Sequence, residues 1–314
     1  MSEEKTFDLI PLGRTDIRIP PLGIGSWQWG DRFIWGYGSG TFSDADLRAA
    51  FNASMQGSVN FFDTAEVYGF GRSETLLGDF MKGAQSPVIV ATKYAPLPWR
   101  LTKGSLRHAL ESSLKRLQLK QVDLYQVHFP MPPIPIETWA NALADVVEAG
   151  LTRTVGVSNY STAQMRRVHE VLAKRGVILA SNQVEYNLLN RGPERTGLLD
   201  ACHELGVTLI AYSPLAQGLL TGKYSLQNPP QGIRANRFKS QYARVAPLVD
   251  KLREMGAQHG GRTPDQVALN WLICKGTVPI PGVKNERQTK QNLGALGWTL
   301  TPDEVKTLDQ LAPL

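Results

Sequence analysis

The sequence predicts a closed (β/α)8 barrel, and three observations carry this prediction. Short apolar, β-branched runs alternate with amphipathic segments of helical period along nearly all of the 314 residues. Eight such runs are present, and this number fits a closed parallel barrel better than an open, doubly wound sheet. No linker, low-complexity tract or internal repeat interrupts the alternation, so we expect residues 1–314 to form a single domain.

The expected elements begin with a short hairpin, because apolar residues flank the turn-forming segment Gly13-Arg14-Thr15-Asp16. The eight expected strands are residues 22–24, 60–62, 88–92, 122–127, 154–157, 179–183, 208–211 and 277–280. Capping signals at Ser161, Thr263 and Thr301 predict helix starts between and after them. Residues 130–135 and 224–237 are expected to be long loops.

Composition and charge narrow the class of protein. Hydrophobic residues make up 42% of the chain and charged residues 20%, which is ordinary for a folded protein with a large core. The net charge of +6 and the pI of about 9.3 suit an anionic small molecule, a nucleic acid or an acidic membrane surface. No block of Lys and Arg stands out, so the small molecule is favoured over nucleic acid and membrane.

Targeting and metal signals are absent from the sequence pattern. The first ten residues lack the charge and apolar pattern of a signal peptide, and no apolar run approaches the roughly 18 residues of a membrane span. Cys202 and Cys274 alone cannot form a disulfide framework or a metal site. We therefore expect a cytoplasmic protein without a metal ion.

Polar side chains follow the second to seventh expected strands, where each strand ends. Asp63, Lys93 and His128 follow three consecutive strands, and Tyr68 lies in the loop after Asp63. The later strand ends carry Ser158, Asn159, Gln183, Tyr212 and Ser213. Each residue alone is an ordinary turn, cap or surface residue. Barrel closure would gather them around one mouth, where the catalytic groups of such barrels lie.

The first four of these residues form a coherent set for reducing a carbonyl group. A phenol has a pKa of about 10, a nearby lysine lowers that pKa, and a carboxylate holds the lysine in place. Tyr68 would then donate a proton to an oxygen that gains negative charge, while neutral His128 orients the same oxygen. No side chain supplies hydride, so a nicotinamide cofactor is implied. The glycines at 36–40 and 69–71 do not have GxGxxG spacing, which argues against a Rossmann dehydrogenase.

Seven motifs resemble the aldo-keto reductase superfamily over nearly the whole chain. They are NFFDTAEVY at 60–68, VATK at 90–93, VDLYQVH at 122–128, VGVSN at 155–159, NQVEY at 182–186, AYSPLAQGLLTGKY at 211–224 and PIPG at 279–282. The SPLAQGLLTGKY segment is most similar to the branch containing potassium-channel β subunits, aflatoxin-aldehyde reductases and related bacterial and plant reductases. The resemblance implies a barrel whose floor is closed by an N-terminal hairpin, and NADPH-dependent reduction of aldehydes or ketones to alcohols.

The resemblance also implies roles for individual residues. Tyr68 would be the general acid, Lys93 and Asp63 the pair that tunes it, and His128 the group that orients the carbonyl. The implied cofactor contacts are Ser158, Asn159 and Gln183 at the nicotinamide carboxamide, Tyr212 against its ring, Ser213, Leu215 and Gly218 along the pyrophosphate, Lys223 with Arg234 or Arg237 at phosphates, and Gly282, Lys284, Gln288, Gln291 and Asn292 in the last cofactor segment.

Two of these positions depart from the branch. Relatives usually have serine where Lys284 stands and a glutamate facing the adenine where Gln291 stands. A cation still suits a 2′-phosphate, and the glutamine carbonyl can still accept a hydrogen bond from the adenine amino group. NADPH is therefore expected to be preferred over NADH.

The expected partner is a small-molecule carbonyl substrate, and loop aromatics are its expected contacts. Trp27 and Phe129 follow the first and fourth strands and are predicted to touch the substrate. Phe129 stands where many relatives have tryptophan, which would widen the pocket. The sequence leaves the oligomeric state open between a monomer and a homo-oligomer.

Two other readings compete with the enzyme. The channel β subunits suggest a cofactor-binding, redox-sensing regulatory subunit with little turnover. The complete set of four residues, and the lack of an extended segment before the hairpin, favour catalysis. Turnover with small aldehydes would distinguish the enzyme from a subunit that binds NADPH tightly without turnover. A basic barrel that binds nucleic acid would require salt-dependent retention of oligonucleotides.

Overall fold

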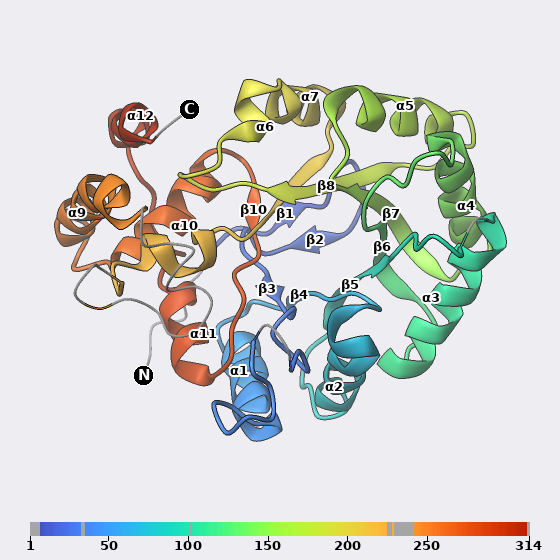
Figure 1. Ribbon diagram of the computed structural model, residues 1–314, viewed down its shortest axis with the longest axis horizontal. Coiled ribbons are helices and arrows are strands. Elements are labelled where there is room, and N and C mark those ends of the chain that lie inside the picture. Colours follow the sequence, from blue (N-terminus) through green and yellow to red (C-terminus); the bar gives the residue numbers. More distant parts are fainter. Residues whose placement is uncertain (1–6, 33–34, 101, 225–227, 229–240, 313–314) are drawn as a thin grey trace.

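The computed structural model confirms the (β/α)8 barrel (Figure 1) and describes residues 7–32, 35–100, 102–224, 228 and 241–312. Eight parallel strands form one sheet in chain order. They are β3 (Ile24–Gly25), β4 (Phe61–Asp63), β5 (Ile89–Tyr94), β6 (Val122–Val127), β7 (Thr152–Ser158), β8 (Leu179–Glu185), β9 (Thr208–Tyr212) and β10 (Val278–Pro279). A parallel bridge between Gly25 and Gly282 joins the two edges and closes the barrel.

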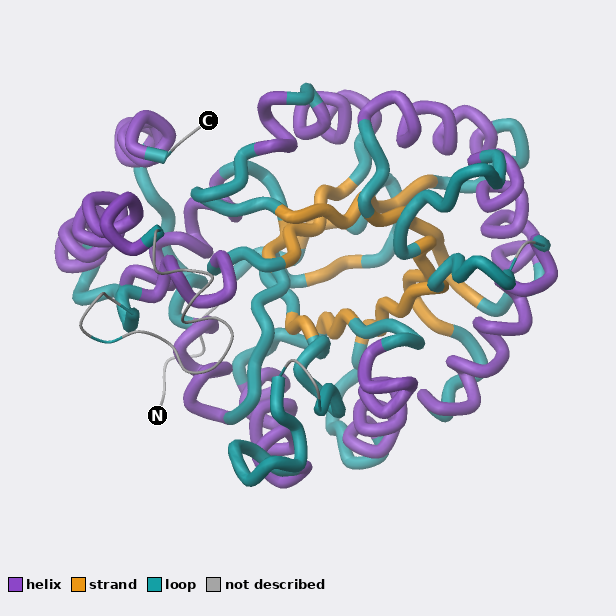
Figure 2. Tube along the Cα trace, viewed as in Figure 1, coloured by secondary structure: helices purple, strands orange, loops and turns teal. Residues whose placement is uncertain are grey.

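Helices surround the ring of strands, as Figure 2 shows. They are α1 (Asp44–Gln56), α2 (Arg72–Met81), α3 (Lys103–Leu117), α4 (Ile136–Glu148), α5 (Thr162–Ala173), α6 (Gly192–Arg195), α7 (Leu198–Leu205), α9 (Tyr242–Gln258), α10 (Pro264–Cys274), α11 (Glu286–Leu293) and α12 (Pro302–Leu311), with the 3-10 turns η1 (Tyr68–Gly71) and η2 (Ala216–Thr221). The capping boxes predicted at Ser161 and Thr301 are present, and Gln266 Oε1 accepts from the backbone N–H of Thr263 at 3.0 Å. Among the helices that the structure describes, none has the length and apolar character that a membrane crossing requires.

An N-terminal hairpin of β1 (Ile10–Pro11) and β2 (Arg18–Ile19) closes the floor, as predicted. Its side chains join an apolar layer inside the barrel, called the floor layer: Leu12, Ile17, Ile19, Phe61, Ala91, Leu124, Ala180, Ile210, Val278 and Ile280. Gly13 lies at the tip with φ +61°, and a Cβ there would come within 2.7 Å of Ala180 O. The close approach of hairpin and barrel therefore requires glycine at this position.

The alternation of side chains along the strands places polar groups above this floor layer. Phe61 belongs to the floor layer, Phe62 packs in the outer core between sheet and helices, and the next side chain is Asp63. On β5, Ala91 and Lys93 follow the same period of two. Apolar side chains thus fill the lower barrel, and charged or amide side chains lie nearer its mouth.

Strand ends differ from the prediction by one or two residues. β7 begins at Thr152 instead of 154, because Thr152 pairs with Val122 at the start of β6. β10 covers only Val278–Pro279, and the closing contact lies further on, at Gly282. Residues 130–135 are a loop as predicted, whereas most of the loop expected at 224–237 lies outside the described residues.

Candidate active site

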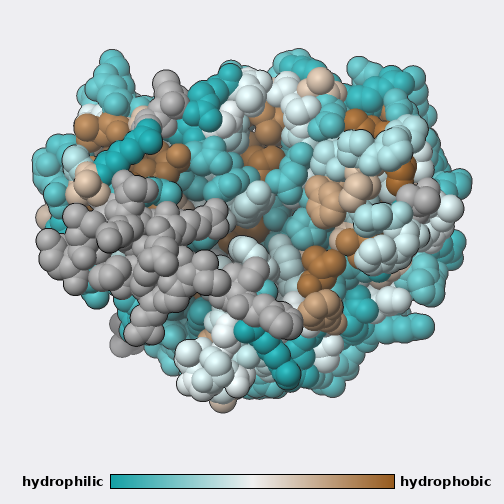
Figure 3. Space-filling model, in the orientation of Figure 1, coloured by the Kyte–Doolittle hydropathy of each residue, from teal (hydrophilic) through white to brown (hydrophobic). Residues whose placement is uncertain are grey.

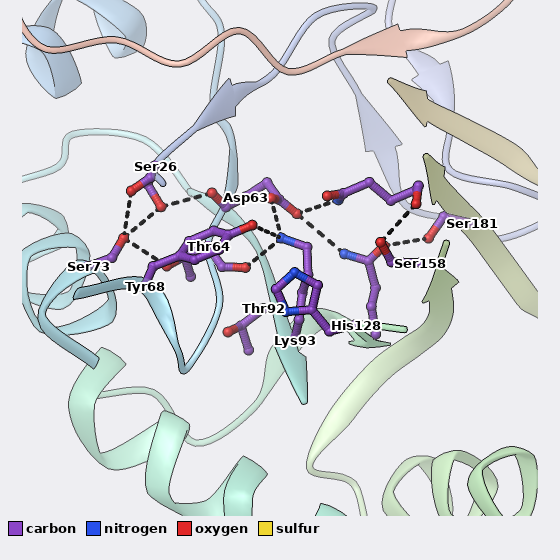
Figure 4. Close-up of polar contacts among 12 residues, drawn as sticks. Ser26, Asp63, Thr64, Tyr68, Ser73, Thr92, Lys93, His128, Ser158 and Ser181 are labelled. Atoms are coloured by element: carbon purple, nitrogen blue, oxygen red, sulfur yellow. Dashed lines mark hydrogen bonds and ion pairs between the residues drawn. The ribbon is translucent and has the colours of Figure 1, made fainter. Parts of the chain in front are cut away.

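A buried ion pair lies at the mouth of the barrel (Figure 4). Lys93 Nζ lies 2.5 Å from Asp63 Oδ1, and both side chains are at most 2% exposed. The same ammonium group donates to Thr64 O at 2.9 Å and to Tyr68 Oη at 3.3 Å. Three donors on one nitrogen therefore hold the carboxylate, the loop backbone and the phenol together.

Two glutamines complete the surroundings of Asp63. Gln183 Nε2 donates to Asp63 Oδ2 at 2.7 Å, and Gln126 Nε2 donates to the same oxygen at 3.3 Å. Ser181 Oγ donates in turn to Gln126 Oε1 at 3.3 Å. Gln126 was not predicted from the sequence, although its spacing from Leu124 of the floor layer indicates an inward-facing side chain.

The pKa values of the central groups are set by burial and by one another. Burial would lower the pKa of Lys93, but the attraction of Asp63 and Tyr68 outweighs it, and the net pKa is raised. For Tyr68, burial raises the pKa more than Lys93 lowers it. Lys93 lowers the pKa of the phenol, as expected, but it does not bring that pKa below its ordinary value, because burial raises it by more. Tyr68 is protonated and Lys93 is charged at neutral pH.

His128 lies beside the phenol and is neutral. Its ring packs edge-on against the Tyr68 ring, with the centroids 5.8 Å apart. Burial and, to a smaller extent, the Lys93 charge lower the pKa of His128 to about 3. Its Nδ1 has no hydrogen-bond partner within the described part of the chain. A neutral imidazole next to Tyr68 is the state that the sequence analysis expected.

A network of hydroxyl groups fixes the loop that carries Tyr68. Ser26 Oγ donates to Asp63 O at 2.9 Å and lies 2.7 Å from Ser73 Oγ. Thr64 Oγ1 donates to Ser73 Oγ at 2.9 Å. Figure 4 shows these bonds on one side of Asp63 and Ser158 and Ser181 on the other. The ends of β3 and β4 and the start of α2 are thereby joined beneath the phenol.

These groups border a cavity of about 830 Å³. In Figure 3, hydrophobic side chains gather around the hollow at the centre of this face. The predicted residues that line the cavity are Trp27, Asp63, Tyr68, His128, Ser158, Asn159, Gln183, Tyr212, Ser213, Leu215, Gly218, Lys223, Gly282, Lys284, Gln288, Gln291 and Asn292. The cavity size is within the roughly 300–1,000 Å³ of ligand pockets.

Two of the predicted residues that the structure describes do not line the cavity. Lys93 is fully buried and reaches it only through Tyr68 and Asp63. Phe129 packs against His128, with ring centroids 5.7 Å apart, but is not part of the cavity wall. Arg234, like Arg237, lies outside the described residues.

One end of the cavity carries amide and hydroxyl groups. Ser158 Oγ donates to Gln183 O at 2.8 Å, and Asn159 Nδ2 donates to His128 O at 3.0 Å. Tyr212 Oη donates to Asn159 Oδ1 at 3.0 Å. Asn159 has a φ of +63°, so this polar side chain is held in a left-handed backbone at the end of β7.

The other end carries cationic side chains. Lys284 Nζ donates to Trp35 O at 3.0 Å and lies above the Phe42 ring, 4.8 Å from its centroid. Gln288 Oε1 accepts from the backbone N–H of Lys284 at 2.8 Å. Arg287, in the first turn of α11, also lines the cavity and was not predicted. No motif in the sequence marks Arg287 as a cavity residue.

The residues along the cavity fit a nicotinamide dinucleotide. Hydroxyl and amide groups at one end suit a carboxamide, and Lys223, Lys284 and Arg287 suit phosphates. Gln28 Oε1 is a buried acceptor in the cavity wall with no partner in the described chain. A Cβ at Gly282 would come within 2.4 Å of three atoms of the Gln28 amide, so only glycine lets this amide pack against the backbone of the cavity wall.

A (β/α)8 barrel with a buried Asp-Lys-Tyr group and a neutral histidine at its mouth defines a barrel-type oxidoreductase. Comparison with known protein families identifies the family to which the chain belongs. The model of the aldo/keto reductase family matches residues 21–313, and the chain belongs to this family.

Named relatives and solved structures agree with this assignment. The chain is 44% identical over 310 residues to pyridoxal reductase, chloroplastic, of Arabidopsis thaliana, covering 94% of this chain and 84% of that protein. It is 33% identical over 325 residues to L-glyceraldehyde 3-phosphate reductase of Escherichia coli, covering 95% and 90%. A thermostable aldo-keto reductase in complex with epalrestat superposes with a TM-score of 0.77 at 32% identity, covering 97% and 100%. The glycerol dehydrogenase of Gluconobacter oxydans superposes with a TM-score of 0.85 at 27% identity, covering 97% and 94%.

Proposed function

We propose that this protein is an NADPH-dependent reductase that converts aldehydes or ketones to alcohols. The observation that carries the proposal is the contact of Tyr68 Oη with the buried Lys93–Asp63 pair, beside neutral His128 at the cavity wall. The family assignment supports the reaction class.

Tyr68 has the properties of a general acid for this reaction. Its raised pKa keeps the phenol protonated at neutral pH, and it faces the cavity where a substrate oxygen can reach it. Hydride comes from the reduced nicotinamide ring when the cofactor is bound. As the oxygen gains negative charge, Tyr68 donates its proton, and Lys93 stabilises the phenolate that remains.

His128 and Asp63 support this transfer from two sides. A neutral imidazole can donate a hydrogen bond to the substrate carbonyl without adding positive charge beside Lys93. Asp63 balances the charge of Lys93 and is itself held by Gln183 and Gln126. The ammonium group therefore keeps its position through the cycle.

The cationic end of the cavity supports NADPH over NADH. Lys284 and Arg287 lie close in sequence at the start of α11, where the helix dipole also favours an anion. We assign these two residues to the 2′-phosphate, and Lys223 to the phosphates nearer the middle. Ser158, Asn159 and Gln183 hold the carboxamide, and Tyr212 lies against the ring.

Flat aldehydes are the best-supported substrates. Trp27 lies with its ring centroid 6.4 Å from that of Tyr68 and 5.4 Å from that of Trp35. This aromatic wall suits a planar substrate that presents its carbonyl to the phenol. The relatives named as pyridoxal reductase and L-glyceraldehyde 3-phosphate reductase also act on aldehydes, so pyridoxal is the first compound to test.

Replacing Tyr68 with phenylalanine tests the proposal. We expect the rate of aldehyde-dependent NADPH oxidation to fall by about 10²–10⁴-fold, while the Kd for NADPH from tryptophan fluorescence stays nearly unchanged. Tyr94→Phe is the matched control, because Tyr94 is buried on β5, bonds Ser105 and does not line the cavity. Full activity of Tyr68→Phe would refute the mechanism. Tight NADPH binding by the wild type, without turnover of any carbonyl, would instead favour the regulatory subunit.

A further inference from the structure

The far end of the cavity contains a side-chain pair that the reaction itself does not use. Gln291 on α11 and Asp265 in the first turn of α10 both line the cavity. Gln291 Nε2 donates to Asp265 Oδ1 at 3.2 Å and to Thr263 Oγ1 at 3.1 Å. Asp265 is only 4% exposed, so its carboxylate is held in the wall and is not a freely solvated charge.

The chemistry of the two groups determines how the Gln291 amide is turned. An ionised carboxylate only accepts hydrogen bonds, so the amide must present its NH2 to Asp265. The backbone is also fixed, because Gln266 Nε2 donates to Gln291 O at 2.9 Å. With Nε2 directed at Asp265, Gln291 Oε1 lies on the opposite side of the amide. This oxygen accepts no hydrogen bond from the described residues and is available to a ligand.

The pair also gives a reason for glutamine at position 291. A glutamate there would place a second carboxylate about 3 Å from Asp265, and two carboxylates at that distance cannot both ionise without a large cost. Glutamine avoids the repulsion and still offers an acceptor oxygen. Asp265 and Gln291 are therefore matched to each other.

The neighbouring charges limit which ligand group can meet this oxygen. Lys284 and Arg287 line the same end of the cavity, so a phosphate of the dinucleotide belongs close by. The group adjoining that phosphate on the dinucleotide is the adenosine, whose base carries an amino group that donates hydrogen bonds. An acceptor oxygen complements that amino group and repels a carbonyl at the same ring position.

We propose that Asp265 is a positioning residue that makes the cofactor site specific for an amino-substituted purine. Asp265 holds the Gln291 amide so that Oε1 faces the 6-amino group of adenine, and a 6-oxo purine is disfavoured. This inference rests on the proposed function, because it takes the ligand of the cavity to be a purine dinucleotide.

The test compares NADPH with its hypoxanthine analogue, in which the 6-amino group is replaced by a carbonyl. The Kd of each is measured by quenching of tryptophan fluorescence, and the ratio of the two is the readout. We expect the wild type to bind NADPH about 5- to 100-fold more tightly than the analogue. This ratio is measured within one protein, so a general loss of affinity in a variant does not alter it.

Asp265→Ala should bring the ratio towards one, because the remaining neighbour, the Thr263 hydroxyl, can donate or accept and leaves the Gln291 amide free to turn. Adding Gln291→Glu to Asp265→Ala should restore the preference for adenine, because a carboxylate accepts in either orientation. Thermal unfolding without cofactor confirms that each variant is folded, and a merely structural role of Asp265 would change stability but not the ratio.

The outcomes separate this inference from the proposed function. Equal affinity of the wild type for both dinucleotides, or an unchanged ratio in folded Asp265→Ala, would overturn the role of Asp265 while the reductase proposal stands. Failure of the wild type to bind either dinucleotide would overturn the proposed function, and this inference with it.

Discussion

His128 makes the stability of the folded protein sensitive to acid, and the size of the effect can be worked out. Its pKa is about 3 in the folded protein, because of burial and the nearby charge of Lys93, and its ordinary value is 6.5. As the pH falls below about 6.5, the unfolded chain takes up a proton that the folded protein does not. Stability therefore decreases by about 1.4 kcal/mol per pH unit until the pH approaches the folded pKa. At about pH 4.5 the expected loss is about 3 kcal/mol.

Replacing His128 with asparagine removes this titration and keeps a polar side chain. We expect urea unfolding, followed by circular dichroism, to give a smaller acid loss for the variant than for the wild type. Between about pH 7 and pH 4.5 the difference in that loss should be about 3 kcal/mol, because the other ionisable groups titrate alike in both proteins. An identical acid loss in the two proteins would show that His128 is not held neutral, and the orienting role assigned to it would be wrong.

Three further substitutions test other parts of the structure. Lys93→Met leaves Asp63 buried without its cation, so the free energy of unfolding should fall by about 3–5 kcal/mol in urea titrations; adding Asp63→Asn should recover most of the loss. Lys284→Ala should weaken NADPH about 10- to 100-fold more than NADH in fluorescence titrations, and equal losses would exclude the 2′-phosphate contact. Gly13→Ala should cost about 1–3 kcal/mol in thermal unfolding, because of its φ of +61° and its contact with β8. Gly83→Ala, in open space, should cost far less.

The barrel and its central residues could be predicted because two simple periods determine them. Strands alternate with helices along the chain, and side chains alternate between inside and outside along each strand. Asp63, Lys93 and His128 end three consecutive strands, so closure of the barrel gathers them whatever the loops do. The position of Tyr68 close to these residues could be predicted because it lies in the loop directly after Asp63.

Other features depend on distances that no sequence pattern contains. The pKa of Tyr68 is a balance between burial, which raises it, and Lys93, which lowers it, and only the structure shows which effect is larger. Gln126 has the same spacing as an ordinary core residue, so its bond to Asp63 could not be distinguished from packing. Asp265 is an acidic residue in the first turn of a helix, a position that the helix dipole alone explains. Its contact with Gln291 depends on how α10 and α11 lie side by side.

The closed floor of the barrel has a consequence for the proposed reaction. A phenol that gives up its proton must regain one before the next cycle. The floor layer beneath Asp63 consists of hydrocarbon and phenyl side chains, which cannot relay protons. In the proposed reaction the proton cannot come through this floor, and the open cavity beside Tyr68 is the direct route for it. Departure of the alcohol and reprotonation of Tyr68 would then use the same opening.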